Sequence, residues 1–156
     1  MTLTKNRTLN ILIADDDSDD RFLFGIALKE VPIPHKLLSV NNGQQLMTYL
    51  NTKALPDVLI LDLNMPLKNG SECVVEIKKM ETMKHLPIIV YSTSLQEEVA
   101  DVLYQNGAHY YLQKTDIGTL VPHLTYVLTK LYNREIERPT REKFILNPKQ
   151  VRSTKF

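Results

Sequence analysis

The sequence predicts an α/β fold in which five parallel strands form a doubly wound sheet covered by helices. Two observations carry this prediction. Short apolar runs of strand length alternate five times with segments of helical period, a pattern typical of right-handed βαβ units. The run at 58–63 is apolar at nearly every position, as in a strand with both faces buried. The 156 residues allow one sizeable core, so we expect a single domain over 1–135 and a tail over 136–156.

The first half of the chain supplies two strands and two helices. Strands are expected at 10–14 and 37–40. Between them, Ser18 can cap a helix whose first turn carries acidic side chains. The apolar stripe of this helix comprises Leu23, Phe24, Ala27, Leu28 and Val31. A second helix follows the turn at 42–43, and its inward side chains are Leu46, Tyr49 and Leu50.

The second half repeats the alternation three times. Strands are expected at 58–63, 87–91 and 109–113. Helices are expected at about 71–80, from Val99 to a cap at Asn106–Gly107, and at about 118–135. The inward side chains of the last helix are Leu120, Leu124, Val127, Leu128 and Leu131. Cys73 lies on the apolar side of its helix, and we interpret it as a small core residue rather than a reactive thiol.

The tail over 136–156 breaks this alternation. Its basic residues are Arg138, Arg141, Lys143, Lys149, Arg152 and Lys155. A segment of about twenty residues is too short for a second domain. Its one apolar patch, 144–146, is the expected anchor. The sequence leaves open whether this patch contacts the rest of the chain or a second copy, or whether the tail is solvated.

The composition argues against several classes of partner. The formal net charge of +1 gives no global reason to expect direct binding to nucleic acid or to an acidic membrane surface. No apolar run approaches the length needed to cross a bilayer, and residues 1–7 lack a signal-peptide core. A single cysteine cannot form an internal disulfide, which suits a reducing compartment. We therefore expect a cytoplasmic protein.

Polar side chains stand where four of the predicted strands end. Asp15 and Asp16 follow the first strand, and Asp62 ends the third. Ser92 follows the fourth strand and Lys114 the fifth. Because parallel strands end at the same edge of a sheet, we expect these side chains to meet in one crevice. Three clustered carboxylates repel one another unless a cation joins them, and oxygen ligands point to Mg²⁺.

Asp62 is the candidate nucleophile of this crevice. A carboxylate can form an aspartyl phosphate, and a metal ion would offset its charge toward an incoming phosphoryl group. Lys114 can pair with phosphoryl oxygens, and the Ser92 hydroxyl can hydrogen-bond another. Each residue also has a structural interpretation: helix caps for the aspartate pair and Ser92, a turn for Asp62, a surface charge for Lys114. Their co-location at the ends of one sheet favours the functional interpretation.

Four segments, taken with Arg21 and Gly70, match one known family. They are 11–17 (ILIADDD), 59–66 (LILDLNMP), 87–92 (PIIVYS) and 107–114 (GAHYYLQK). By these segments, residues 10 to about 133 resemble the receiver domain of two-component response regulators. The resemblance implies a flavodoxin-like (βα)5 fold with the strand order 2-1-3-4-5.

The resemblance also implies the chemistry of the crevice. Asp62 would accept a phosphoryl group from a sensor histidine kinase or a phosphotransfer protein. Asp16, Asp62 and the backbone carbonyl of Asn64 would bind Mg²⁺ directly, and Asp15 would act through water. The lack of an output domain after the last predicted helix favours stand-alone receivers, including those that work with bacterial phytochromes.

The same resemblance implies a switch. Lys114 would contact the phosphoryl oxygens, Ser92 would move toward them as the switch hydroxyl, and Tyr111 would rotate inward as the switch aromatic. The surface of the fourth helix, fifth strand and fifth helix would thereby change. This surface carries Tyr104 and Tyr110, and we expect it to contact a partner or a second copy in a homodimer.

One position departs from the family's pattern. The lysine is usually followed by proline through a cis bond, whereas Thr115 follows Lys114 here. A cis bond before a non-proline residue costs about 3 kcal/mol. Either the loop stabilises such a bond, or the bond is trans and Lys114 approaches from another angle. Thr93 beside Ser92 is a second candidate hydroxyl, although the strand period favours Ser92.

We therefore expect a response regulator whose only chemistry is its own phosphorylation and dephosphorylation, and not an enzyme in any other sense. Other classes of function compete with this interpretation. A phosphatase with an aspartyl-phosphate intermediate commonly needs a second acid two residues past the nucleophile, where Asn64 stands here. The acidic crevice disfavours a flavodoxin-like cofactor binder. The complete residue set disfavours a non-phosphorylated receiver-like scaffold. Asn64 and Ser94 are candidates for controlling the attacking water and hence the lifetime of the phosphorylated form.

Overall fold

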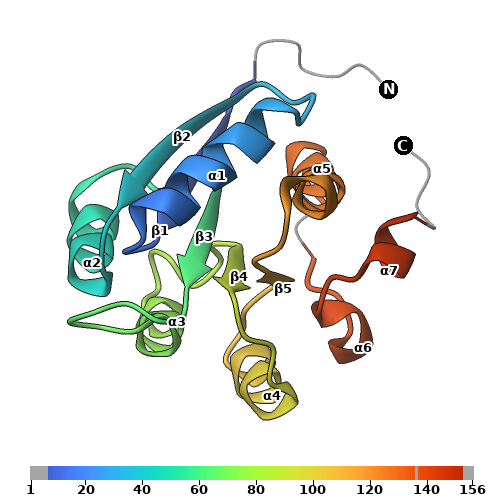
Figure 1. The fold of residues 1–156 in the computed structure, drawn as a ribbon. Coiled ribbons are helices and arrows are strands. Elements are labelled where there is room, and N and C mark those ends of the chain that lie inside the picture. Colours follow the sequence, from blue (N-terminus) through green and yellow to red (C-terminus); the bar gives the residue numbers. More distant parts are fainter. Residues whose placement is uncertain (1–6, 136, 153–156) are drawn as a thin grey trace.

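The computed structural model describes residues 7–135 and 137–152, and its core is a single parallel sheet (Figure 1). The strands are β1 (Leu9–Ala14), β2 (His35–Val40), β3 (Val58–Asp62), β4 (Ile88–Ser92) and β5 (Tyr110–Gln113). Their order across the sheet is β2-β1-β3-β4-β5, and every neighbouring pair is parallel. The predicted doubly wound, five-stranded parallel sheet and its order 2-1-3-4-5 are therefore confirmed.

Helices cover both faces of the sheet. They are α1 (Ser18–Lys29), α2 (Gly43–Thr52), α3 (Gly70–Lys79), α4 (Glu97–Gln105), α5 (Ile117–Tyr132), α6 (Arg141–Phe144) and α7 (Pro148–Arg152). One core lies between the sheet and α1 and α5, and the other between the sheet and α2, α3 and α4. Successive β1 side chains alternate between them, Ile11 and Ile13 joining the first core and Leu12 and Ala14 the second. Both faces of β1 are thus buried, whereas the edge strand β2 has no fully buried side chain.

The loop after β3 folds back closely against the end of that strand. A Cβ added to Gly70 would lie 2.4 Å from the carbonyl oxygen of Asp62, so this approach requires glycine. The Gly70 N–H donates to the carbonyl of Leu63 at 2.9 Å. Asn69 caps α3 in a reciprocal pair of hydrogen bonds with Glu72. These contacts fix the backbone that carries Asp62 at the carboxyl end of the central strand β3.

Three predictions about α1 were wrong. The cap is Asp17 rather than Ser18: the Asp17 carboxylate accepts the N–H groups of the second and third residues after it, at 2.8 and 3.2 Å. Ser18 is already the first helical residue, so its hydroxyl does not occupy the capping position. Leu23 is 44% exposed, because neighbouring positions point about 100° apart and Phe24 takes the inward direction. The helix also ends at Lys29, before the predicted end of the stripe.

The other helices agree more closely with the predictions. The inward side chains predicted for the last helix are all buried: Leu120, Leu124, Val127, Leu128 and Leu131. Cys73 is fully buried, and burial raises the pKa of its thiol to about 11, so its interpretation as a core residue is confirmed. No helix in the described ranges is both long and apolar enough to cross a bilayer.

The tail packs on the body of the same chain (Figure 1). Phe144 is fully buried, and Ile145 forms a parallel bridge with Tyr111 on β5. The Leu146 N–H donates to the Tyr111 carbonyl at 3.0 Å. The predicted anchor at 144–146 is confirmed, and it occupies the outer edge of the sheet in its own chain. Of the predicted tail, residues 136 and 153–156 lie outside the described ranges.

The tail also covers part of the surface formed by α4, β5 and α5. The Arg138 guanidinium lies 4.1 Å from the centre of the Tyr104 ring, and the Tyr104 hydroxyl donates to the Pro139 carbonyl at 2.7 Å. Tyr110 is only 7% exposed. In this structure the tail therefore contacts Tyr104, and Tyr110 is buried; contact of the surface formed by α4, β5 and α5 with a partner or a second copy stays a prediction.

Candidate functional site

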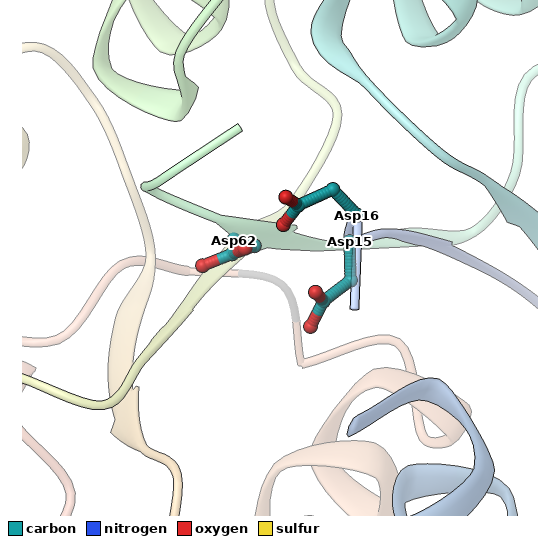
Figure 2. A group of neighbouring side chains, drawn as sticks. All are labelled: Asp15, Asp16 and Asp62. Carbon is teal, nitrogen blue, oxygen red and sulfur yellow. The ribbon is translucent and has the colours of Figure 1, made fainter. Parts of the chain in front are cut away.

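Three carboxylates meet where β1 and β3 end. Asp15 and Asp16 follow β1 directly, and Asp62 is the last residue of the neighbouring β3. One oxygen from each lies within 4.8 Å of the others (Figure 2). Asp15 and Asp62 are buried and Asp16 is exposed. The sheet therefore forms an acidic crevice that opens to solvent on the side of Asp16.

Backbone contacts hold these carboxylates in place. Asp15 Oδ1 accepts the Asp17 N–H at 3.0 Å, and Arg21 donates to the Asp15 carbonyl at 2.6 Å. Asp62 Oδ1 accepts the Asn64 N–H at 3.3 Å. The two buried acids are thus oriented by the start of α1 and by the loop after β3, before any ligand is considered.

Burial and mutual repulsion govern the charge of Asp62. The pKa of Asp62 is raised from 3.8 to about 7: burial is the largest cause, the nearby Asp15 carboxylate also raises it, and Lys114 lowers it. Two buried carboxylates side by side do not both ionise readily without added positive charge. Three carboxylate ligands in this arrangement suit a hard divalent cation, which prefers oxygen. The donor set therefore fits the metal site that the sequence predicts.

Lys114 reaches the same crevice from the end of β5. The backbone N–H of Lys114 donates to the Ser92 carbonyl at 2.8 Å, and this hydrogen bond fixes the backbone at the end of β5. Its Nζ lies 2.9 Å from Asp15 Oδ2, 2.8 Å from Asp20 Oδ2 and 3.6 Å from Asp62 Oδ1. Burial lowers the pKa of this ammonium, but the surrounding carboxylates more than offset burial and raise the pKa above its ordinary value. Lys114 is therefore a charged partner of the acids.

The peptide bond after Lys114 is trans, since no described peptide bond is cis. Of the two alternatives left open by Thr115, the second therefore holds in this structure. Asp116 caps α5 by accepting the Thr119 N–H at 2.7 Å. The trans bond still delivers the ammonium to the acidic crevice.

Ser92 and Tyr111 lie beside the crevice on β4 and β5. Ser92 is fully buried, and its Oγ makes no hydrogen bond of ordinary geometry with a described residue. Neither Ser92 nor Ser94 caps α4, whose capping position is Gln96. Tyr111 is 1% exposed, and its hydroxyl donates to the Ser94 carbonyl at 2.6 Å. Because Tyr111 is already buried, a switch at this residue would change its contacts rather than its exposure.

Comparison with known proteins identifies the family. The family described as the response regulator receiver domain matches residues 11–125. The chain belongs to this family. Response regulator Rcp1 of Synechocystis sp. is 32% identical over 111 residues, which cover 67% of this chain and 76% of Rcp1.

Solved structures of similar receivers agree with this assignment. The Mn²⁺-bound form of Rcp1 has a TM-score of 0.71 and 27% identity, covering 85% of this chain and 99% of that one. The phosphorylated cyanobacterial phytochrome response regulator RcpA has a TM-score of 0.72 and 27% identity, covering 86% and 100%. Receivers of this family are signalling proteins of two-component systems and interact with histidine kinases or phosphotransfer proteins.

Beside the crevice of this receiver lies a cavity of about 290 Å³, between the loops that follow β3 and β4. Its lining residues are Leu63, Asn64, Asn69, Ser71, Ser94, Gln96, Val99 and Tyr111. Asn64 and Ser94, the two candidates for controlling water, therefore face the same space. This placement leaves room for water next to Asp62's loop.

The sequence did not identify two residues that contact Lys114 in the receiver's site. Asp20 looked like a first-turn acid of α1, yet its carboxylate binds Lys114. Tyr91 looked like an ordinary strand residue, yet Lys114 Nζ lies 5.3 Å from the centre of its ring. The one available signal was helical direction: side chains in the first turn lean back toward the strand end that precedes the helix.

Proposed function

We propose that this receiver accepts a phosphoryl group on Asp62 from a histidine kinase or a phosphotransfer protein. The observation that carries the proposal is the convergence of Asp15, Asp16, Asp62 and Lys114 in one crevice, from three separate strand ends. An Asp62 carboxylate oxygen attacks phosphorus, the bond from phosphorus to the donor imidazole nitrogen breaks, and that nitrogen keeps the electron pair and takes up a proton. Lys114 supplies positive charge beside the transferring group.

Mg²⁺ is the cation we propose for the acidic crevice. Asp16, Asp62 and the Asn64 carbonyl would hold it, with Asp15 acting through water; the manganese-bound structure of Rcp1 supports a divalent ion in a related receiver. When bound, the ion would neutralise charge between the carboxylate and the phosphoryl oxygens. The raised pKa of Asp62 supports this role, because an unneutralised carboxylate is disfavoured there.

The proposed switch runs from Ser92 and Tyr111 to the outer edge of the sheet. Ser92 Oγ makes no hydrogen bond of ordinary geometry within the described ranges, although its interaction with the Tyr111 hydroxyl opposes the rise that burial causes in the pKa of Tyr111. A turn of Ser92 toward a phosphoryl oxygen would therefore change its contact with Tyr111. Tyr111 contacts the Ser94 carbonyl through its hydroxyl and Phe144 through its ring. A shift of the loop after β4 would therefore reach the tail.

We propose that the partner surface comprises α4, β5, α5 and the tail that follows the receiver at 1–135. A homodimer would use the same surface. We also propose that the protein is cytoplasmic.

Asp57 provides a matched control for a test of Asp62. It precedes β3, at the opposite end of the strand, where its carboxylate accepts the Asn10 N–H at 2.7 Å. With Mg²⁺ and either a ³²P-labelled histidine kinase or phosphoramidate, we expect Asp62→Asn to lose labelling to background and Asp57→Asn to retain it. Equal labelling of the two variants would refute the assignment.

A further inference from the structure

Lys114 is hydrogen-bonded to a carboxylate outside the acidic cluster. Its Nζ lies 2.8 Å from Asp20 Oδ2, in the first turn of α1 and 94 residues away in sequence. The distance to Asp62 Oδ1 is 3.6 Å, beyond an ordinary hydrogen bond. The ammonium is therefore bound to α1 more closely than to the candidate phosphoacceptor.

This contact is shielded from solvent. The Lys114 side chain is 10% exposed and that of Asp20 28%. A charge-assisted hydrogen bond in such a place is stronger than a surface ion pair. Lys114 Nζ donates a hydrogen bond to Asp20 and forms an ion pair with Asp15 Oδ2 at 2.9 Å, so Asp62, or a group bound to it, competes with two other carboxylates for this ammonium.

We propose that Asp20 is a positioning residue that restrains Lys114 in the unphosphorylated receiver. On phosphorylation of Asp62, Lys114 exchanges part of its contact with Asp20 for a phosphoryl oxygen. The proposal rests on the function proposed for Asp62. Asp20 acts through Lys114, and the restraint lowers the affinity of the site for a phosphoryl group because part of a charge-assisted hydrogen bond is lost when the group binds.

The competing interpretation is that Asp20 only stabilises the start of α1. An acid in the first turn interacts favourably with the helix dipole, and the exposed Asp19 does so equally. Asp19→Asn is therefore the matched control for Asp20→Asn: both remove one negative charge from the same turn. A double-mutant cycle with Lys114→Ala separates an effect through Lys114 from a general change in charge.

The test measures binding of beryllofluoride, a phosphoryl mimic, with Mg²⁺ by ¹⁹F NMR. We expect Asp20→Asn to raise the affinity about fivefold, Asp19→Asn to leave it unchanged, and Asp20→Asn to have no effect when combined with Lys114→Ala. Without beryllofluoride, Asp20→Asn and not Asp19→Asn should speed proton exchange of the Lys114 ammonium.

Several results would overturn the proposal: an unchanged or lowered affinity in Asp20→Asn, an equal rise in both Lys114 backgrounds, or unchanged proton exchange at Lys114. If the affinity results fail in either of these ways but the wild type still binds beryllofluoride, the function proposed for Asp62 is not contradicted. A wild type that binds none, or an Asp62→Asn variant that binds as well as the wild type, would refute the proposed function itself.

Discussion

Asp62 combines two demands that oppose each other. A phosphoacceptor has to be an ionised nucleophile, yet this carboxylate is 4% exposed and lies beside a second buried acid. Its raised pKa is the consequence, with burial as the largest cause. A bound cation resolves the conflict, because it favours the ionised carboxylate that the reaction requires. In the proposed function, one residue would therefore serve as both nucleophile and metal ligand, and the reason would be electrostatic.

The raised pKa predicts how stability depends on pH in the absence of metal. Between pH 3.8 and about 7 the folded protein holds a proton on Asp62 that the unfolded chain has released, so the free energy of unfolding falls as pH rises. Relative to Asp62→Asn, we expect the free energy of unfolding of the wild type to fall by on the order of 3 kcal/mol from pH 4 to pH 8. Urea denaturation in EDTA measures this difference.

Mg²⁺ provides the control for that experiment. At pH 8 the ion should raise the stability of the wild type and have little effect on Asp62→Asn, because ligands that bind only the folded state stabilise it. Asp57→Asn should behave as the wild type does. If the free energy of unfolding of the wild type and that of Asp62→Asn differed by the same amount at both pH values, the raised pKa of Asp62 would be contradicted.

The strand-end residues were predictable and the contact of Asp20 was not. Parallel strands place Asp15, Asp62 and Lys114 at one edge whatever the details of packing, so strand positions alone were sufficient. The pairing of Asp20 with Lys114 depends on how α1 is rotated against the loop after β5. Helical direction indicates that a first-turn side chain leans toward the preceding strand end, but it does not indicate which residue of another loop that side chain meets.

At the scale of single elements, the cap of α1 gives a direct test. Asp17→Ala removes an acceptor of two backbone N–H groups and should cost about 1 kcal/mol of unfolding free energy. Ser18→Ala should cost less than half of that, since its hydroxyl makes no capping contact. Urea unfolding of the two single variants measures the difference. Equal losses would restore Ser18 as the cap.

Element types were predicted better than element ends and faces. The alternation of strand and helix periods located all five strands; in β3 and β4, burial on both faces leaves a continuous apolar run, whereas the partly exposed β2 was located from its short run at 37–40. The predicted face of α1 was too wide, since periodicity does not say which of two adjacent apolar positions points inward. The apolar patch at 144–146 identified the anchor of the tail, but the surface it contacts depends on the assembled sheet.

At the scale of the whole molecule, the tail forms one bridge to β5 and contacts Tyr111, the residue proposed as the switch aromatic. Phe144 packs edge-on against Tyr104 and Tyr111, with ring centres 5.2 and 6.3 Å apart. Arg141 pairs with Glu97 and Asp101 of α4 at 2.7 and 2.8 Å. The outer edge of β5 is therefore occupied by the chain itself, which protects an otherwise open strand edge.

Phe144 should control how firmly the tail is docked. Phe144→Ala removes a fully buried ring, a loss of about 3 kcal/mol if the tail stays in place. We expect the tail to open while the receiver stays folded, so that the loss appears as local opening. Hydrogen exchange of the Leu146 amide, which bonds to Tyr111, should speed up on the order of a hundredfold, and that of Ile60 in β3 should not change. The exposed neighbour Lys143→Ala should leave both rates unaltered. Equal acceleration at Leu146 and Ile60 would instead mean that tail and receiver unfold as one unit.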